Sequence, residues 1–263
     1  MPIKQITIMV AVHKEYEFPD DDGYLPIHVG KQNSLVELGI EGDNTGINIS
    51  KLNPYFCELT GLYWMWKNVE SEYYGLSHYR RYFLPVNRSS FSLVKGKKIA
   101  SSTSLMELLN EYEVVLSKPR NYFIETIESH YKNAHEERDL VLLKGVMSEV
   151  CPEYLPELES VLQGKKVSLY NMFIMNRTNF ESYCDWLFSL LIPLKDQIPY
   201  KSYGPYQKRV FGFLAERLLN VWVLKNFSND KIYHASVINL EGESLVDKAK
   251  GLLLRKFFGS KQS

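Results

Sequence analysis

The chain contains the stretch Tyr73-Tyr74-Gly75-Leu76-Ser77-His78-Tyr79-Arg80-Arg81-Tyr82-Phe83, in which a short apolar run leads into a histidine and two adjacent arginines. The apolar run predicts a buried strand that ends at these cations. Arginine carries a planar fork of donors that matches phosphate oxygens, and it stays charged at any working pH. The aromatic neighbours would hold the arginine stems in place. We therefore expect a diphosphate site at this strand end, with a solvated surface pair of arginines as the alternative.

Strands and helices alternate on both sides of this stretch. The apolar, β-branched run 6–12 predicts a buried parallel strand that ends at His13 and Lys14. Further strands are expected at 27–30, 114–116, 167–175 and 231–238. Helices are expected at 102–110, 126–143, 152–162, 179–191 and 209–223, with one more that begins at Pro54 behind an Asn53 cap. The alternation predicts an α/β fold built on a single layered sheet.

Composition and motif searches exclude several classes of protein. Basic and acidic side chains are balanced at 31 each, which argues against a general nucleic-acid binder. The three cysteines are far apart and form no CxxC, so neither a disulfide framework nor a cysteine zinc site is expected. The chain also lacks GxGxxG, Walker A, HExxH and GxSxG motifs. His130, His135, Glu136 and Glu137 are interpreted as a solvated helix face, because a spacing of five suits two metal ligands poorly.

The end of the chain differs from the rest. We expect one domain over residues 1–242 and an amphipathic basic helix over residues 243–263. Its apolar positions recur at helical spacing, and they are accompanied by Lys248, Lys250, Arg255, Lys256 and Lys261. This pattern suits the surface of an anionic membrane, or a helix packed on the rest of the chain or on a second subunit. With no signal peptide and no apolar window long enough to span a bilayer, the expected location is the cytoplasm, peripheral at the inner face of the plasma membrane.

Three motif blocks together resemble a known family. They are Asn48-Ile-Ser-x-x-Asn53-x-x-x-Cys57-Glu58-Leu-Thr60-x-Leu-Tyr63-Trp64-x-Trp66-Lys67-Asn68, then Gly75-Leu-x-His78-Tyr-Arg80-Arg81-Tyr-Phe, then Arg209-Val-Phe-Gly212-x-Leu-x-Glu216-Arg217-Leu-Leu-Asn220-Val. Asn171-Met-Phe-Ile-Met and Tyr183-Cys184-x-Trp186-Leu-Phe agree with them. Over roughly residues 5–240 the chain is similar to bacterial glycosyltransferases of capsule, exopolysaccharide and lipopolysaccharide loci, long catalogued as a domain of unknown function.

The resemblance implies a glycosyltransferase-A fold, a single Rossmann-like mixed sheet flanked by helices. It also implies transfer of a sugar, with galactofuranose and inversion as the specific expectation, from a nucleoside diphosphate donor such as a UDP-sugar. Most glycosyltransferase-A enzymes carry an Asp-x-Asp that holds a divalent metal, and here His78-Tyr79-Arg80 stands in that place. Fixed cations could stabilise the leaving diphosphate directly, so we expect no metal and no other cofactor.

Site residues are assigned on this basis. His78, Arg80 and Arg81 are expected to meet the diphosphate, and His13, Lys14, Asn48 and Asn53 to contact the nucleotide or donor sugar. Asn171, Arg209 and Arg217 are expected to face the acceptor, an oligosaccharide or lipid-linked hydroxyl compound. Glu216 is the candidate general base, although a buried Glu216–Arg217 pair that only fixes its helix explains the sequence equally well. A non-catalytic carbohydrate- or nucleotide-binding module and a sugar-nucleotide hydrolase remain as alternatives.

Overall fold

A computed structural model describes residues 4–87 and 89–242, and it has the expected α/β architecture. The central sheet runs in the order β11-β7-β10-β3-β1-β2, and β4 joins β3 to β12 beside it. Its strands are β1 (Lys4–Val12), β2 (Tyr24–His28), β3 (Ser71–His78), β4 (Arg81–Phe83), β7 (Val114–Ser117), β10 (Phe173–Asn176), β11 (Ile232–Ala235) and β12 (Val237–Asn239). Two small two-stranded sheets lie apart from it: a hairpin of β5 (Phe91–Val94) and β6 (Lys97–Ala100), and the pair β8 (Arg120–Asn121) and β9 (Lys166–Val167).

Strand direction brings several loops to one edge of the sheet. β1 runs parallel to both β2 and β3, and β7 runs parallel to β11. β10 is antiparallel to β3 and to β7, so these two also run in the common direction. The carboxyl ends of β1, β2, β3 and β7 therefore meet at the edge where β10 begins. In open α/β sheets this edge is the usual place for a ligand.

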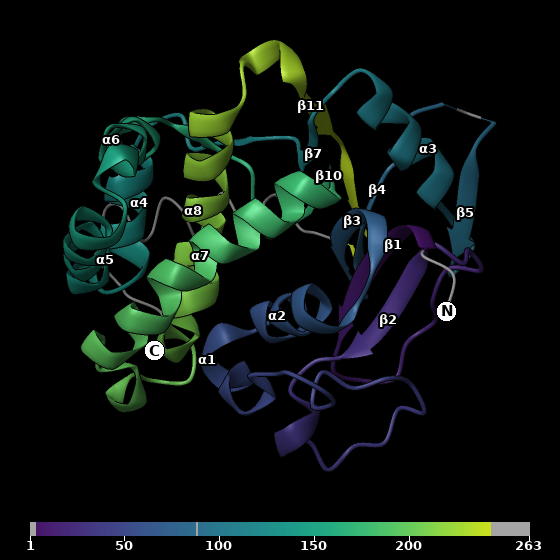
Figure 1. Ribbon diagram of the computed structural model, residues 1–263, viewed down its shortest axis with the longest axis horizontal. Coiled ribbons are helices and arrows are strands. Elements are labelled where there is room, and N and C mark those ends of the chain that lie inside the picture. The colour runs from purple at the N-terminus through teal and green to yellow at the C-terminus, as the bar shows by residue number, and fades with distance from the viewer. Residues whose placement is uncertain (1–3, 88, 243–263) are drawn as a thin grey trace.

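Helices cover the sheet on two faces, as Figure 1 shows. On one face lie α2 (Leu59–Asn68), α7 (Arg177–Gln197) and α8 (Val210–Asn226), with α4 (Ile127–Ala134), α5 (Glu137–Val150) and α6 (Leu155–Gln163) beyond them. The other face carries α3 (Ser102–Glu107) and the β5–β6 hairpin. The alternation of β1 divides the core accordingly, because Met9 and Ala11 join one cluster of buried residues while Ile8 and Val10 join the other.

Two expected elements are interrupted in ways that matter for the site. The helix after Asn53 is two helices, α1 (Asn53–Phe56) and α2, because the Asn53 side chain donates to the Cys57 carbonyl at 2.8 Å and the backbone turns there. The strand expected over 167–175 is also broken, since β9 ends at Val167 and β10 begins only at Phe173. Both interruptions follow from polar side chains that bond the backbone more favourably than a regular ladder would.

Other boundaries differ in the same manner. The helix expected over 126–143 divides into α4 and α5 at His135 and Glu136, and the strand expected over 231–238 divides into β11 and β12. The second strand lies at Tyr24–His28, slightly before the expected range. The basic helix expected over 243–263 lies outside the residues that the structure describes.

Candidate functional site

A cleft of about 750 Å³ opens at the carboxyl edge of the sheet. Its walls are the loops after β1, β2, β3 and β7, the segment before β10, and parts of α4 and α8. Most of its charged or titratable lining side chains are basic: His13, His78, Arg80, Arg81, Arg120, His130, His135, Lys208, Arg209 and Arg217. Asn53, Glu58 and Glu216 also line it. Among the described lining residues the carboxylates are those of Glu58 and Glu216, so basic side chains dominate the cleft.

The strand-end wall of the cleft is built from His13 after β1 and from His78, Arg80 and Arg81 after β3. Arg80 and Lys14 both bind the carboxylate of Glu241, at 3.2 and 3.0 Å. The Leu240 amide donates to the Arg80 carbonyl at 2.8 Å, so the chain after β12 holds this segment from outside. Hydrogen bonds from Lys14 and Arg80 lower the pKa of Glu241. The Glu241 carboxylate thus pairs with the Arg80 guanidinium, and an anionic ligand could take the place of that carboxylate.

Arg81 and His78 are both tied to Tyr170. The Arg81 guanidinium lies over the Tyr170 ring, 4.4 Å from its centroid, which holds a planar cation against an aromatic face. His78 contacts the Tyr170 carbonyl through Nε2 at 2.6 Å. Burial lowers the pKa of His78, with the Glu58 carboxylate opposing that effect. A carbonyl oxygen can only accept, so Nε2 carries the proton and donates it there.

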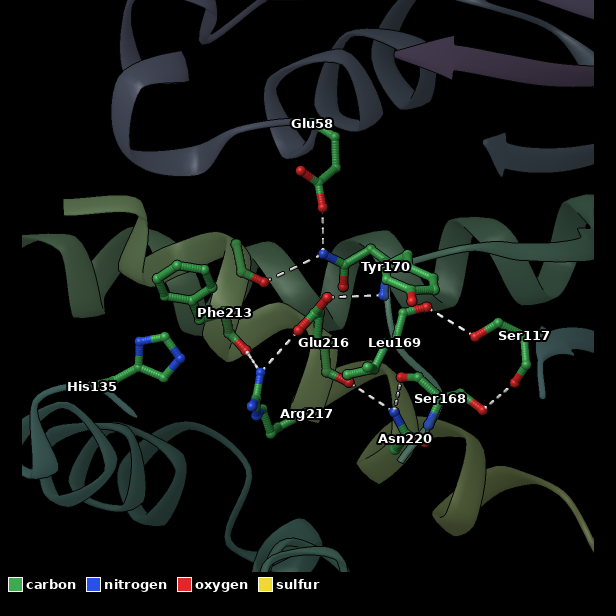
Figure 2. Close-up of polar contacts among 12 residues, drawn as sticks. Glu58, Ser117, His135, Ser168, Leu169, Tyr170, Phe213, Glu216, Arg217 and Asn220 are labelled. Carbon is green, nitrogen blue, oxygen red and sulfur yellow. Dashed lines mark hydrogen bonds and ion pairs between the residues drawn. The ribbon is translucent and has the colours of Figure 1, made fainter. Parts of the chain in front are cut away.

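The segment before β10 organises the floor of the cleft. Tyr170 and Asn171 have φ angles of 76° and 54°, a left-handed conformation that is strained for tyrosine and tolerated by asparagine. Ser117 on β7 donates to the Leu169 carbonyl at 2.9 Å, and Asn220 on α8 pairs with the Ser168 backbone. These bonds, drawn in Figure 2, keep the strained turn in one shape.

Glu216 lies beneath this turn and is fully engaged. One oxygen accepts from the Tyr170 amide at 2.8 Å, and the other accepts from Arg217 at 2.9 Å. Burial raises the pKa of Glu216, while Arg217 and the Tyr170 amide oppose the rise. The Arg217 side chain is only 3% exposed and also donates to the Phe213 carbonyl. Both residues line the cleft, yet their polar atoms are largely committed to the fold.

Glu58 reaches the same turn from the opposite side, as Figure 2 shows. One of its oxygens accepts from the Asn171 side chain at 2.7 Å. Asn171 itself is 1% exposed and lies behind the cleft wall. Cys57, just before Glu58, has φ 53° and ψ −131°, and its thiol accepts from Arg209 at 3.4 Å. Burial raises the pKa of Cys57 to about 11, so this thiol stays protonated at neutral pH.

The helix wall of the cleft carries two histidines that sequence analysis placed on a solvated helix face, which is wrong. His130 and His135 are 9% and 5% exposed. His130 contacts Glu125 at 2.8 Å and stacks on Tyr122, whereas His135 contacts Gln207 at 3.0 Å and packs on Phe213. His135 is buried at the break between α4 and α5, which the helical spacing did not reveal, whereas His130 faces inward from the middle of α4. Together with Tyr206 they give the cleft an aromatic side.

The structure brings most of the predicted site residues together. His13, Asn53, His78, Arg80, Arg81, Arg209, Glu216 and Arg217 line the cleft. Lys14 points to Glu241, and the Asn48 amide donates to the Thr45 and Gly46 carbonyls within its own loop. Neither Lys14 nor Asn48 is among the cleft-lining residues. Glu58, Arg120, Tyr170 and Lys208 also line the cleft, although no local pattern predicted a role for them. Each comes from a short element or a connection whose position depends on tertiary contacts.

The residues at the end of β3 do not suit a divalent metal. Where an Asp-x-Asp would stand, the chain has His78, Tyr79 and Arg80, and arginine cations repel a metal ion. Within residues 4–87 and 89–242 no three His, Cys, Asp or Glu side chains cluster as metal ligands. Metal-independent chemistry stays a prediction, to be tested by chelation.

Comparison with known proteins places the chain in a family. Residues 7–227 match the family model described as "Domain of unknown function (DUF4422)". The chain belongs to this family. Among curated proteins no match was found. A solved structure, described as the apo structure of the WbbM bifunctional glycosyltransferase, superposes on the chain with a TM-score of 0.82 at 29% identity.

The match covers a different share of each of the two chains. The match covers 92% of this chain and 46% of the WbbM chain, so this protein spans about half of the larger one. The match confirms the expected fold class, a mixed sheet flanked by helices. In the part of the chain that the structure describes, no helix is long and apolar enough to cross a bilayer.

Proposed function

We propose that this protein is a glycosyltransferase that moves a sugar from a nucleoside diphosphate donor to a hydroxyl of a saccharide acceptor. The observation that carries the proposal is the cationic cleft at the carboxyl edge of the sheet, in a chain that is 29% identical to a bifunctional glycosyltransferase. Arg80 and Arg81 follow the end of the central strand β3 at this edge, next to the loops of β1 and β7. Such a site can hold a diphosphate without further charge.

The proposed reaction divides the cleft between donor and acceptor. The strand-end wall takes the diphosphate, where Arg80 and Arg81 neutralise the charge that builds on the leaving group. His78 orders the adjacent Tyr170 carbonyl, and His13 and Asn53 lie where a nucleotide or donor sugar would pass. The aromatic side near His135, Tyr206 and Phe213 suits the C–H faces of an acceptor sugar, with Arg209 beside it.

The finer specificity rests on the family resemblance of the motif blocks. We propose a UDP-sugar donor, galactofuranose as the transferred sugar and inversion at the anomeric carbon. The acceptor would belong to a capsule, exopolysaccharide or lipopolysaccharide precursor. The aromatic side of the cleft and its excess of cations are compatible with this substrate class, and only substrate screening can identify the sugar.

A mass-spectrometric screen tests the proposal directly. UDP-glucose, UDP-galactopyranose, UDP-galactofuranose and UDP-N-acetylglucosamine are each incubated with the full chain and a panel of alkyl glycosides. A transferase gives a product heavier by one hexose residue, or by one N-acetylhexosamine residue with the last donor, and releases UDP faster when acceptor is present. Equal UDP release without acceptor would indicate a hydrolase. UDP binding without turnover of any pair would indicate a binding module.

Membrane attachment through residues 243–263 is a separate proposal that follows from their basic, amphipathic sequence. A lipid-linked acceptor would make a location at the inner membrane surface useful. We expect the full chain to float with phosphatidylglycerol-containing liposomes, and a chain truncated after Glu243 to stay behind. If both chains fail to bind anionic vesicles, the segment has no membrane role and packing on the protein becomes the better explanation.

A further inference from the structure

Glu216 and Glu58 contact the turn at Tyr170 and Asn171 from opposite sides, but they differ in how many of their carboxylate oxygens are hydrogen-bonded. Glu216 uses both oxygens, one on the Tyr170 amide and one on Arg217. A carboxylate with donors on both oxygens, one of them an arginine, has no oxygen open to an acceptor hydroxyl, and protonation would also give up a charge-assisted bond. Figure 2 shows Glu216 enclosed by these partners. These contacts indicate that Glu216 stabilises the conformation of the turn at Tyr170.

Glu58 has the opposite arrangement. Only one oxygen is held, by the Asn171 side chain at 2.7 Å. The second oxygen makes no hydrogen bond to any residue within the described ranges, and it is not among their buried, unsatisfied atoms. Because Glu58 lines the cleft, that second oxygen is accessible from it. A carboxylate oriented through one oxygen and open through the other is the geometry that a general base needs.

The residue before Glu58 has a strained backbone conformation. Cys57 lies at φ 53°, ψ −131°, a conformation that non-glycine residues rarely adopt, and it separates α1 from Glu58, the residue that precedes α2. Gly61, one turn later, lets α2 approach the sheet, since a Cβ there would lie 2.7 Å from a Val29 methyl group. Strained residues that persist because their surroundings hold them are concentrated at functional sites. Here the strained residue immediately precedes Glu58, whose side chain lines the cleft.

Other proton-accepting groups near the turn are less suitable. His78 has Nε2 occupied as a donor to the Tyr170 carbonyl. The Cys57 thiol stays protonated, as its raised pKa of about 11 shows. His130 and His135 use Nδ1 on Glu125 and Gln207 and lie on the helix wall. Among these groups Glu58 combines access to the cleft with a fixed orientation.

We propose that Glu58 is the general base of the transfer reaction and that Asn171 is its positioning residue, an inference that rests on the proposed function. The open oxygen of Glu58 takes the proton of the acceptor hydroxyl while the oxygen of that hydroxyl forms a bond to the anomeric carbon. The bond from the anomeric carbon to the diphosphate breaks, and its electron pair leaves on the diphosphate oxygen beside Arg80 and Arg81. The products are the glycoside, the nucleoside diphosphate and a protonated Glu58, which then returns its proton to water.

The test uses the donor and acceptor pair that gives product with the wild-type chain. Glu58→Gln should lower kcat by about 10²- to 10⁴-fold, the usual contribution of a general base. Its UDP affinity, measured by calorimetry, and its melting temperature should stay near those of the wild type. Glu58→Ala should regain turnover as sodium formate is added, because a small carboxylate can replace the missing base, whereas sodium chloride at equal ionic strength should not help.

Glu216→Gln is the matched control. It keeps an acceptor for the Tyr170 amide but leaves Arg217 without its counter-charge, so its melting temperature should fall. Turnover of the folded protein should remain within about tenfold of the wild type, and formate should have no effect on Glu216→Ala. Near wild-type turnover of Glu58→Gln, or formate rescue at position 216 alone, would overturn the assignment. A Glu58→Gln variant that loses UDP affinity and thermal stability along with turnover would show a purely structural role. Absence of turnover by the wild type with every pair would instead overturn the proposed function itself.

Discussion

The strand-end wall and the helix wall of the cleft carry charge in different ways. On the strand-end wall, Arg80 and its partner Glu241 have side chains that are 38% and 33% exposed. On the helix wall, Arg217 and Glu216 are 3% and 19% exposed. An exposed ion pair contributes little to stability, so an anionic ligand can replace one partner cheaply. Breaking a buried pair leaves an uncompensated charge, and that pair therefore belongs to the architecture. Changes to the first wall should alter function, and changes to the second should alter folding.

Arg217→Met should have the largest effect and should act on stability. Methionine fills similar volume but leaves Glu216 buried without its cation, which costs about 3–5 kcal/mol at neutral pH. Burial already raises the pKa of Glu216, and loss of Arg217 raises it further. A raised native pKa means that the carboxyl group favours folding while protonated, and that this advantage is lost as pH rises through that pKa. Thermal unfolding should therefore show a larger deficit at pH 7.5 than at pH 5, and an equal deficit would contradict it.

Arg80→Ala and Arg81→Ala should act on turnover instead. Each removes a charge-assisted contact to the leaving diphosphate, for which we expect a loss of about 2–4 kcal/mol in transition-state stabilisation. That corresponds to a fall in kcat/KM of roughly 30- to 900-fold. The melting temperature of Arg80→Ala should hardly change, because its ion pair with Glu241 is exposed. If both variants keep near wild-type kinetics, the strand-end wall does not bind the diphosphate.

Glu241→Gln tests whether an exposed carboxylate competes with the ligand. Glutamine removes the negative charge beside Lys14 and Arg80 and should leave the fold intact. Since exposed pairs contribute about 0.2–1 kcal/mol, UDP should bind up to about fivefold more tightly at low salt. The gain should disappear in high salt, where surface charges are screened. Weaker UDP binding would mean that Glu241 positions Arg80 rather than occupying it.

Chelation should have the smallest effect. The end of β3 has cations in place of a metal-binding Asp-x-Asp, so turnover in excess EDTA should equal that of the untreated protein. Added manganese or magnesium should not increase it. A loss of activity that either metal restores would show that the strand-end wall needs an ion in addition to its arginines.

The sequence alone predicted the strands and the strand-end residues that form the strand-end wall. Continuous apolar runs identified β1 and β3, and the polar residues at their ends had to meet because parallel strands share an edge. The local pattern therefore predicted that the two arginines lie at this edge, where they line the cleft. Helix and strand periodicity is a short-range property, and it survives in the sequence wherever one face of an element is buried.

Tertiary structure decided the rest of the site. The left-handed turn at Tyr170 and Asn171 interrupts what the sequence presents as one apolar strand, and it exists because Glu58, Glu216, Ser117 and Asn220 bond its backbone and side chains from three other elements. The break at Cys57 that exposes Glu58 is equally invisible locally, since cysteine has no preference for positive φ. Both turns are held by contacts between residues more than 40 positions apart in the chain, such as those of Glu58 with Asn171 and of Tyr170 with Glu216. Local pattern therefore specified which strands form and which polar residues lie at their ends, whereas the strained turns depend on long-range bonds that outweigh local propensity.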